Sequence, residues 1–508
     1  MTNCFAETGF YWRPVGGNNI DQISGHCYQY TDIVSKKSGL SATTIIVDLG
    51  KFDNHQALGI KNSAAAVPDI RDLLKTPFLN PGAVFLTHSH PDHLNGIVHY
   101  LKAGYLMPPL YGGKYTKMIL EDLYAGFDVP KYRRPDFHCI RDGDKIKIGS
   151  LEIEVIAASH TCFDSFGFII KSRFATVYHT GDMKIDNSTY FRKPTNVKTI
   201  RRLAPQITHV VADFCGITED GFAIREVDTF KKIVQIIKKQ HKDKIFIPVY
   251  PTHPEMYLTA FLAALKLRKN VVFYGSDNFY GYLDLIKKYG ISFAKAAKGR
   301  IKIFTGKPRD IQKLGKSFVV IGDYNDIGNS FGDCADNSIG IITARTFFNP
   351  LKGQFNSRNI KFVTVEDYPE LQGYGHGFAG DFEYLNSLLE KPVFIPTHCP
   401  CYIAESSRGL MQYLGLNLIE TTPKNNQTYR LEAGKCILAD EAPATWLVVS
   451  YGSGGATFSE VWQKPTSGEG FLKRTFSARR CKNKFKMLLL RRQKKGETDE
   501  NHETCRNI

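Results

Sequence analysis

Short apolar runs typical of β-strands alternate with helical patterns over roughly the first two hundred residues. The strand-like runs cover residues 43–49, 83–87, 151–156, 166–170 and 176–179. The apolar residues between 92 and 105 have helical spacing, which predicts a helix there. This alternation predicts an α/β or α+β architecture.

The pattern of apolar and polar residues changes near residue 209. The segments HVVAD, KIFIPVY, NVVFYGS, KSFVVIGD and IGIITA have the character of short buried strands, separated by helix-length stretches such as 227–239. This βαβ pattern predicts a second, mostly parallel sheet. A mixed pattern returns after residue 360, with a strand predicted at 393–397 and a helix at 404–416.

The composition is that of a globular protein. Of the 508 residues, 43% are hydrophobic and 23% are charged, which excludes a wholly disordered chain, a collagen-like fibre and a small disulfide scaffold. No apolar run approaches the roughly 18 residues of a membrane span, and the best candidate, 257–267, is expected to be a buried helix, so no membrane partner is expected. Eleven thinly spread cysteines and an N-terminus without a signal pattern favour a cytoplasmic protein with reduced thiols.

The formal net charge of +16 favours an anionic partner such as nucleic acid. From residue 466 onward there are 12 basic and 5 acidic residues, so this segment supplies +7 and the rest of the chain +9. Its middle, 473–495, contains eleven Lys or Arg residues and no acidic residue. Two interpretations stay open: a solvated, disordered charge run, or an arm that binds the phosphate backbone and folds only when bound.

The strongest chemical signal is the segment THSHPDHLNG at 87–96. It places four metal-ligand side chains after a predicted strand and at the start of a predicted helix: His88, His90, Asp92 and His93. Imidazole and carboxylate donors suit zinc, and the absence of nearby cysteines argues against a structural thiolate site. Four such residues within six positions rarely arise in an ordinary polar surface loop.

This HxHxDH segment resembles the motif of the metallo-β-lactamase superfamily, which implies two zinc ions, with manganese as an alternative. The resemblance assigns His160, in ASHTCFDS, to the first metal and His398, in FIPTHCP, to the second. It assigns Asp182, in HTGDMKID, to bridge both metals, and Asp48, at the end of TTIIVDL, to brace the ligand loop. Each of these residues alone would be an ordinary polar loop residue; their order and their contexts favour ligation.

The 216 positions between Asp182 and His398 resemble the β-CASP branch of nucleic-acid hydrolases, in which a whole domain is inserted there. Asp213 in VVADFCG resembles the first acidic motif of that branch, and His376 in GYGHGFAG resembles its last histidine. The implied fold is a metallo-β-lactamase αββα sandwich with an inserted βαβ β-CASP domain. The expected parts are 1–208 and 361–452 for the sandwich, 209–360 for the insert and 453–508 for a basic, flexible tail.

Within this branch the chain resembles ribonuclease J over about residues 14–420. Ordered short matches carry the resemblance, including PVGGNNIDQ at 14–22 and HTCFDSFGFII at 160–170. It implies a zinc-dependent ribonuclease, acting as an exonuclease, an endonuclease or both on single-stranded RNA, and a homo-oligomer, either a dimer or a tetramer. The expected catalytic residues are Asp92, Asp213, which would position the attacking water, and His376, which would contact the scissile phosphate.

The chain also departs from the family pattern. Where the family has FASNxxR, this chain has VYPTHPEMY at 249–257, so His253 is either a shifted substitute for the second histidine of the branch or a turn-capping or surface residue. The phosphate-binding loop of the family is replaced by IGDYNDIGN, which leaves 5′-phosphate sensing open. Two alternative functions also stay open: a DNA nuclease of the same branch, and a non-catalytic RNA-binding subunit.

Overall fold

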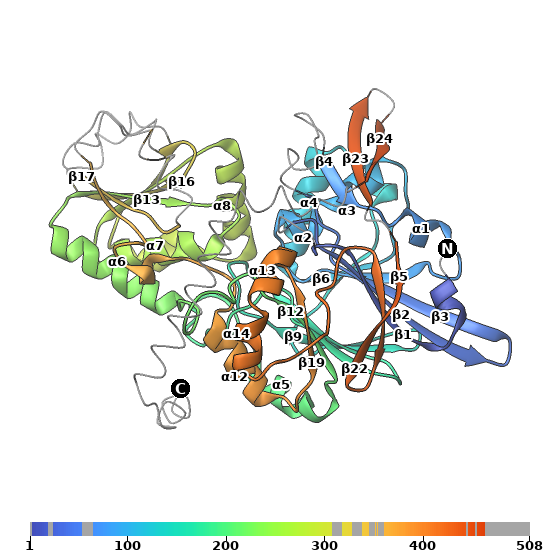
Figure 1. Ribbon diagram of the computed structural model, residues 1–508. Helices are drawn as coiled ribbons and strands as arrows, with labels where there is room; N and C mark the ends of the chain where they lie inside the picture. Colours follow the sequence, from blue (N-terminus) through green and yellow to red (C-terminus); the bar gives the residue numbers. More distant parts are fainter. Residues whose placement is uncertain are drawn as a thin grey trace.

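The structure of the chain is a computed structural model, drawn as a ribbon in Figure 1. It describes residues 3–18, 24–52, 65–306, 317–327, 338–344, 351, 353, 360–442, 445–452 and 455–462. The basic segment from residue 466 and positions 328–329 of the substituted phosphate-binding loop lie outside the described residues.

The two largest sheets have eight and seven strands. In spatial order the eight-stranded sheet contains β22 (Lys435–Glu441), β21 (Gln427–Glu432), β1 (Gly9–Gly16), β2 (Cys27–Lys36), β3 (Gly39–Val47), β5 (Pro81–Phe85), β6 (Leu110–Gly112) and β7 (Phe137–Cys139). The seven-stranded sheet contains β20 (Asn417–Leu418), β19 (Val393–Thr397), β12 (His209–Asp213), β11 (Thr176–His179), β10 (Phe166–Lys171), β9 (Leu151–Ala157) and β8 (Lys145–Ile148).

These two sheets pack face to face and share one buried core. Side chains such as Trp12 and Phe85 from the first sheet meet Phe168 and Ile395 from the second. Strand β9 shows why: Leu151 and Ile153 are buried whereas Glu152 between them is exposed, because alternate side chains of a strand point to opposite faces.

Helices cover the outer faces of both sheets. The helices of these layers are α1 (Arg71–Lys75), α2 (Pro91–Leu94), α3 (Gly96–Lys102), α4 (Lys114–Gly126), α5 (Val197–Leu203), α12 (Ala379–Leu388), α13 (Cys401–Ser406) and α14 (Arg408–Tyr413). Leu203 of α5, Phe382 of α12 and Met411 of α14 pack in one cluster with Tyr178 and Val210 of the seven-stranded sheet. The result is the predicted αββα sandwich.

A third sheet forms a separate lobe, drawn in green and yellow in Figure 1. Its six strands are all parallel, in the order β15 (Ile303–Thr305), β14 (Asn270–Tyr274), β16 (Phe318–Asp323), β13 (Lys244–Val249), β17 (Ser338–Ile341) and β18 (Ile360–Val363). The helices of this lobe are α6 (Glu226–Gln240), α7 (Pro254–Lys266), α8 (Asp277–Tyr289) and α9 (Phe293–Ala297). The parallel sheet and the helix at 227–239 are therefore as predicted, and α7 is the buried helix expected at 257–267. No helix within the described residues is long and apolar enough to cross a membrane.

The first strand of the βαβ series was assigned to the wrong sheet. Strand β12, the HVVAD segment, lies between β11 and β19 in the seven-stranded sheet and pairs with both in parallel. A short buried strand has the same local pattern in either sheet, so only its neighbours could decide. At its other end the six-stranded sheet extends through residue 363.

Each of the two predicted helices at 92–105 and 404–416 is divided in two. The first breaks at Asn95, because Gly96 N donates to Leu49 O (2.9 Å) and Leu49 N donates to His93 O (2.8 Å). These bonds from the loop after β3 replace helical ones. The second breaks at Ser407, between α13 and α14.

Regular secondary structure also extends past residue 452. Strand β24 (Gly455–Trp462), within the range expected to be tail, pairs with β23 (Thr445–Gly452), and β23 pairs with β4 (Ala65–Pro68). The bounds of the proposed domains otherwise remain a prediction.

Candidate metal centre

Three groups of metal-ligand side chains lie side by side where strands of the sandwich end. The first cluster is His88, His90, His160 and Asp182. The second cluster is His26, Asp92, His93 and His398. The third cluster is Asp213, Cys215, His376 and His398. Within each cluster, one potential ligand atom per residue lies within 4.8 Å of those of all the others.

Asp48 organises the loop that carries the HxHxDH motif. It follows β3 with a positive φ of 61°, and its carboxylate accepts hydrogen bonds from Thr87 N, Thr87 Oγ1 and His93 Nδ1, each 2.8 Å long. Gly50, two residues later, is needed because a Cβ there would lie 1.6 Å from Asp92 O. The DLG sequence therefore allows the backbone after β3 to approach the HxHxDH loop closely. Asp48 supports this loop with its hydrogen bonds, as expected.

In the first cluster, hydrogen bonds fix which ring nitrogen faces inward. The Thr87 hydroxyl donates to Asp48, so its oxygen accepts from His88 Nδ1 at 3.0 Å. His160 Nδ1 donates to Gly375 O at 3.0 Å. Both rings therefore present an Nε2 lone pair, and His90 presents Nδ1, which lies 3.0 Å from His88 Nε2 and 3.2 Å from His160 Nε2.

Asp182 lies between the first and the second cluster. Its Oδ2 atom is 3.7 Å from His88 Nε2 and 3.6 Å from His160 Nε2 on one side. On the other side it is 3.4 Å from His93 Nε2 and 3.0 Å from His398 Nε2. One carboxylate oxygen is thus within reach of both clusters, which is the arrangement that a bridging ligand needs.

The electrostatics of the two clusters favour a cation. Burial lowers the pKa of His88 and His160 well below the usual histidine value, so both rings are neutral donors. Burial opposes the ionisation of Asp182, yet the neighbouring His398 and His93 hold its pKa well below its usual range. Burial likewise disfavours a charged His93, yet Asp182 and Asp92 raise the pKa of His93 to about 10. The carboxylates therefore attract positive charge, which a metal ion supplies when it displaces the protons.

The residues present fit metal ions well. The donors of both clusters are imidazole nitrogens and carboxylate oxygens, buried and converging, with the opposite ring nitrogens of His88, His93 and His160 held by oxygen atoms. All seven expected ligands lie in these two clusters, which could hold metal ions.

In the third cluster the carboxylate of Asp213 contacts two histidines. Its Oδ2 atom is 2.7 Å from His376 Nδ1, and its Oδ1 atom is 3.4 Å from His398 Nδ1. Burial lowers the pKa of His376, but Asp213 raises it more, to about 9. The His376 side chain is 15% exposed, so it can meet a substrate.

His253 lies at the edge of the first cluster. It precedes α7 without a capping hydrogen bond from its side chain, so the turn-capping interpretation is wrong. Its ring centroid is 5.0 Å from that of His90 and 4.9 Å from that of Tyr250. A catalytic role stays untested.

The sequence interpretation missed His26. It directly precedes β2, outside the motif, and its ring stacks against His93 and His398 with centroid distances of 4.4 and 4.1 Å. The signal available was a lone histidine in SGHC, shortly after the PVGGNNIDQ segment. The histidines interpreted as structural or surface residues lie outside the three clusters: His99, His138, His179, His209 and His241.

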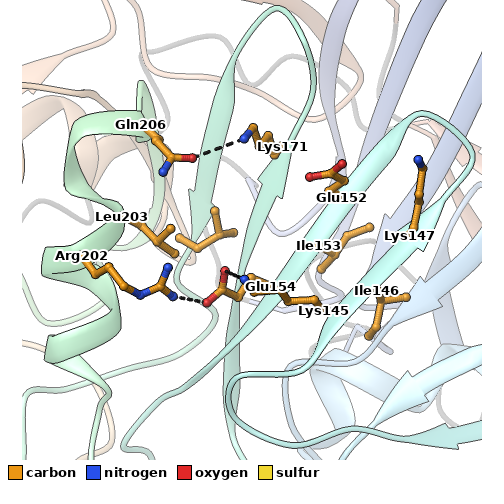
Figure 2. A pocket seen from close by; sticks show the side chains of 11 residues that line it. Lys145, Ile146, Lys147, Glu152, Ile153, Glu154, Lys171, Arg202, Leu203 and Gln206 are labelled. Atoms are coloured by element: carbon orange, nitrogen blue, oxygen red, sulfur yellow. Dashed lines mark hydrogen bonds and ion pairs between the residues drawn. The ribbon is translucent and has the colours of Figure 1, made fainter.

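A separate surface pocket lies over β8, β9, β10 and α5 and is shown in Figure 2. None of the clustered residues lines it. Three of its charged residues pair with one another: Lys145 lies 3.8 Å from Glu154, and Arg202 forms an ion pair with the same carboxylate. The metal centre is therefore the candidate functional site.

Comparison with known proteins identifies similar families. The model of the beta-lactamase superfamily domain matches residues 66–220. A ribonuclease J of Sinorhizobium meliloti is 20% identical over 418 residues, covering 78% of this chain and 71% of that protein. A ribonuclease J of Mycobacterium tuberculosis is 24% identical over 417 residues, covering 78% and 72%. These matches support a ribonuclease J-like metallo-β-lactamase/β-CASP protein.

A solved structure has a fold similar to that of this chain. It is a protein of unknown function from Enterococcus faecalis V583, matched with a TM-score of 0.55 at 19% sequence identity. The match covers 85% of this chain and 100% of that one. It shows a shared fold.

Proposed function

We propose that this chain is a zinc-dependent ribonuclease that hydrolyses phosphodiester bonds of single-stranded RNA with two metal ions. The observation that carries the proposal is the position of Asp182 Oδ2, within 3.0–3.7 Å of imidazole nitrogens from both clusters. The first ion would be held by His88, His90 and His160, and the second by Asp92, His93 and His398, with Asp182 shared. Manganese would be accepted by the same donors.

The residues around the ions have distinct tasks. When bound, two such ions supply a nucleophilic water at neutral pH and offset the negative charge on the phosphate. Asp182 would be shared by the two ions, and Asp48 keeps the His93 ring turned so that its Nε2 atom faces Asp182. Hydrolysis joins water to phosphorus and breaks the bond to the leaving oxygen, which takes up a proton.

His376 is suited to supply that proton. Asp213 holds its Nδ1 atom and raises the pKa of His376 to about 9, so the ring is protonated at neutral pH. The partly exposed imidazolium can donate to a phosphate oxygen or to the leaving oxygen. Asp213 also contacts His398, so it ties this donor to the second metal position.

The choice of RNA rests on the relatives, which are named ribonuclease J, and is compatible with the net charge of +16. The test is incubation with 5′-labelled single-stranded RNA and DNA of identical sequence, with and without added zinc or manganese. The proposal predicts metal-dependent cleavage of RNA, and the product lengths distinguish exonucleolytic from endonucleolytic cleavage. Cleavage of DNA alone would make the protein a DNA nuclease, and binding without cleavage would make it a non-catalytic subunit.

Three further expectations belong to this proposal. They are a cytoplasmic location, a homo-oligomeric state as a dimer or a tetramer, and the division into a sandwich with an inserted domain. Size-exclusion chromatography with light scattering would measure the oligomeric state.

A further inference from the structure

His26 is built into the metal centre, although it lies more than sixty residues before the HxHxDH motif. Its side chain is fully buried, and its backbone is fixed on both sides. His26 N donates to Asp92 O at 2.8 Å, and Gly50 N donates to His26 O at 2.9 Å. The ring is therefore held by the loops that carry the motif and its brace.

Hydrogen bonding also holds the orientation of the His26 ring. The Tyr28 hydroxyl oxygen lies 3.0 Å from His26 Nδ1, so this ring nitrogen already has a partner. The other ring nitrogen, Nε2, faces Asp92.

The second ring nitrogen of His26 points into the second cluster. His26 Nε2 is buried and has no hydrogen-bond partner, and Asp92 Oδ2 lies 3.5 Å from it. The same Asp92 oxygen is 3.7 Å from His93 Nε2 and 3.9 Å from His398 Nε2. A metal ion bound among these atoms would take His26 Nε2 as an electron-pair donor and so satisfy this buried atom.

We propose that His26 Nε2 is a further ligand of the second metal ion, an inference that rests on the proposed function. The protein donors at that position are then His26, Asp92, His93, His398 and Asp182. The two positions consequently differ. The first has four protein donors and suits tetrahedral zinc, whereas the second has five and suits a divalent ion that accepts five or six ligands, such as Mn²⁺ or Co²⁺.

The test compares metal binding by the wild type and by His26→Ala. Metal-free full-length protein is titrated with Co²⁺ in competition with a chelator, and bound cobalt is measured by elemental analysis and by visible absorption. Wild type should bind two equivalents. His26→Ala should keep the first with unchanged affinity and lose more than about 100-fold for the second, beyond the 10–100-fold typical of groups that only support a ligand. The absorption of the remaining bound cobalt should match a four-coordinate ion.

His209→Ala is the matched control, because His209 is also buried and histidine-to-alanine truncation creates a similar cavity outside the three clusters. Tyr28→Phe is the second variant, and it removes only the hydroxyl that contacts His26 Nδ1. It should weaken the second equivalent by about 10-fold while the fold is retained, as judged by thermal unfolding.

The outcomes separate this inference from the proposed function. If the wild type takes up no metal, the two-metal proposal fails. If the wild type and His26→Ala both bind two equivalents with equal affinity and identical spectra, only the assignment of His26 is overturned. A His26→Ala protein that loses both equivalents equally, while His209→Ala retains them, would place His26 in a structural role instead.

Discussion

Replacing Asp48 by Asn tests how hydrogen bonds set the metal ligands. Asp48 Oδ1 accepts from Thr87 N at 2.8 Å, so the amide oxygen of Asn must occupy that place. The amide NH₂ group then takes the place of Oδ2, which is 2.8 Å from His93 Nδ1 and 2.8 Å from Thr87 Oγ1. A donor replaces an acceptor at both contacts.

The exchange reverses the ring tautomers. With NH₂ donating to His93 Nδ1, the neutral form of the ring, which is the form that binds a metal, would carry its proton on Nε2, the atom that faces Asp182 at 3.4 Å. Thr87 Oγ1, now an acceptor from Asn, turns its hydrogen to His88 Nδ1 at 3.0 Å, and His88 reverses too. A protonated ring nitrogen cannot bind a metal. Each metal position should weaken by about 10–100-fold, which corresponds to about 1.4–2.7 kcal/mol.

The assay is zinc competition with a chelator, followed by elemental analysis of the dialysed protein. Asp32→Asn is the matched control, because Asp32 is equally buried in the eight-stranded sheet and accepts from Ser172 Oγ at 2.7 Å, outside the three clusters. The control should bind two equivalents with wild-type affinity. If Asp48→Asn also keeps wild-type affinity at both positions, the tautomer argument is refuted.

Four other changes have defined outcomes. Asp182→Asn should lower the occupancy of both metal positions in elemental analysis, because its Oδ2 atom contacts both clusters; loss at one position alone would contradict bridging. His376→Ala should keep both metals and lose about 10²–10⁴-fold in RNA cleavage rate, and loss of metal would mean that the residue does not face substrate. Burial raises the pKa of Glu226 from 4.5 to about 8, so the native state loses stability as the pH rises from 4.5 to 8. Glu226→Gln should therefore raise the free energy of unfolding, measured by urea denaturation, by up to about 3 kcal/mol at pH 7 and leave it unchanged below pH 4.5. An effect that does not depend on pH would exclude this cause. Truncation after residue 465 should leave the metal content intact, weaken RNA binding and flatten the dependence of log affinity on log salt; equal slopes would show that the basic segment does not contact RNA.

Local sequence was sufficient to predict the metal ligands that lie close together in the chain. The HxHxDH segment places His88, His90, Asp92 and His93 within six positions, and a strand end followed by a helix start forces these side chains into one small volume. Short apolar runs likewise predicted the sandwich strands, since a run of a few apolar residues is a local signal for a buried strand. The ordered motifs then pointed to His160, Asp182 and His398 through resemblance, and the fold brings them to the same clusters.

Tertiary structure decided what depends on neighbours distant in the chain. The HVVAD strand could belong to either sheet until its partners β11 and β19 were known. The helix after the motif divides because Leu49, far back in the sequence, takes over its hydrogen bonds. His26 had no recognisable spacing to the motif, and its place in the second cluster arises from the pairing of its backbone with Asp92 and Gly50. The local sequence determines the pattern of apolar residues in each strand and helix. Which strands pair and which ligands converge depends on long-range packing, which no single stretch of the chain specifies.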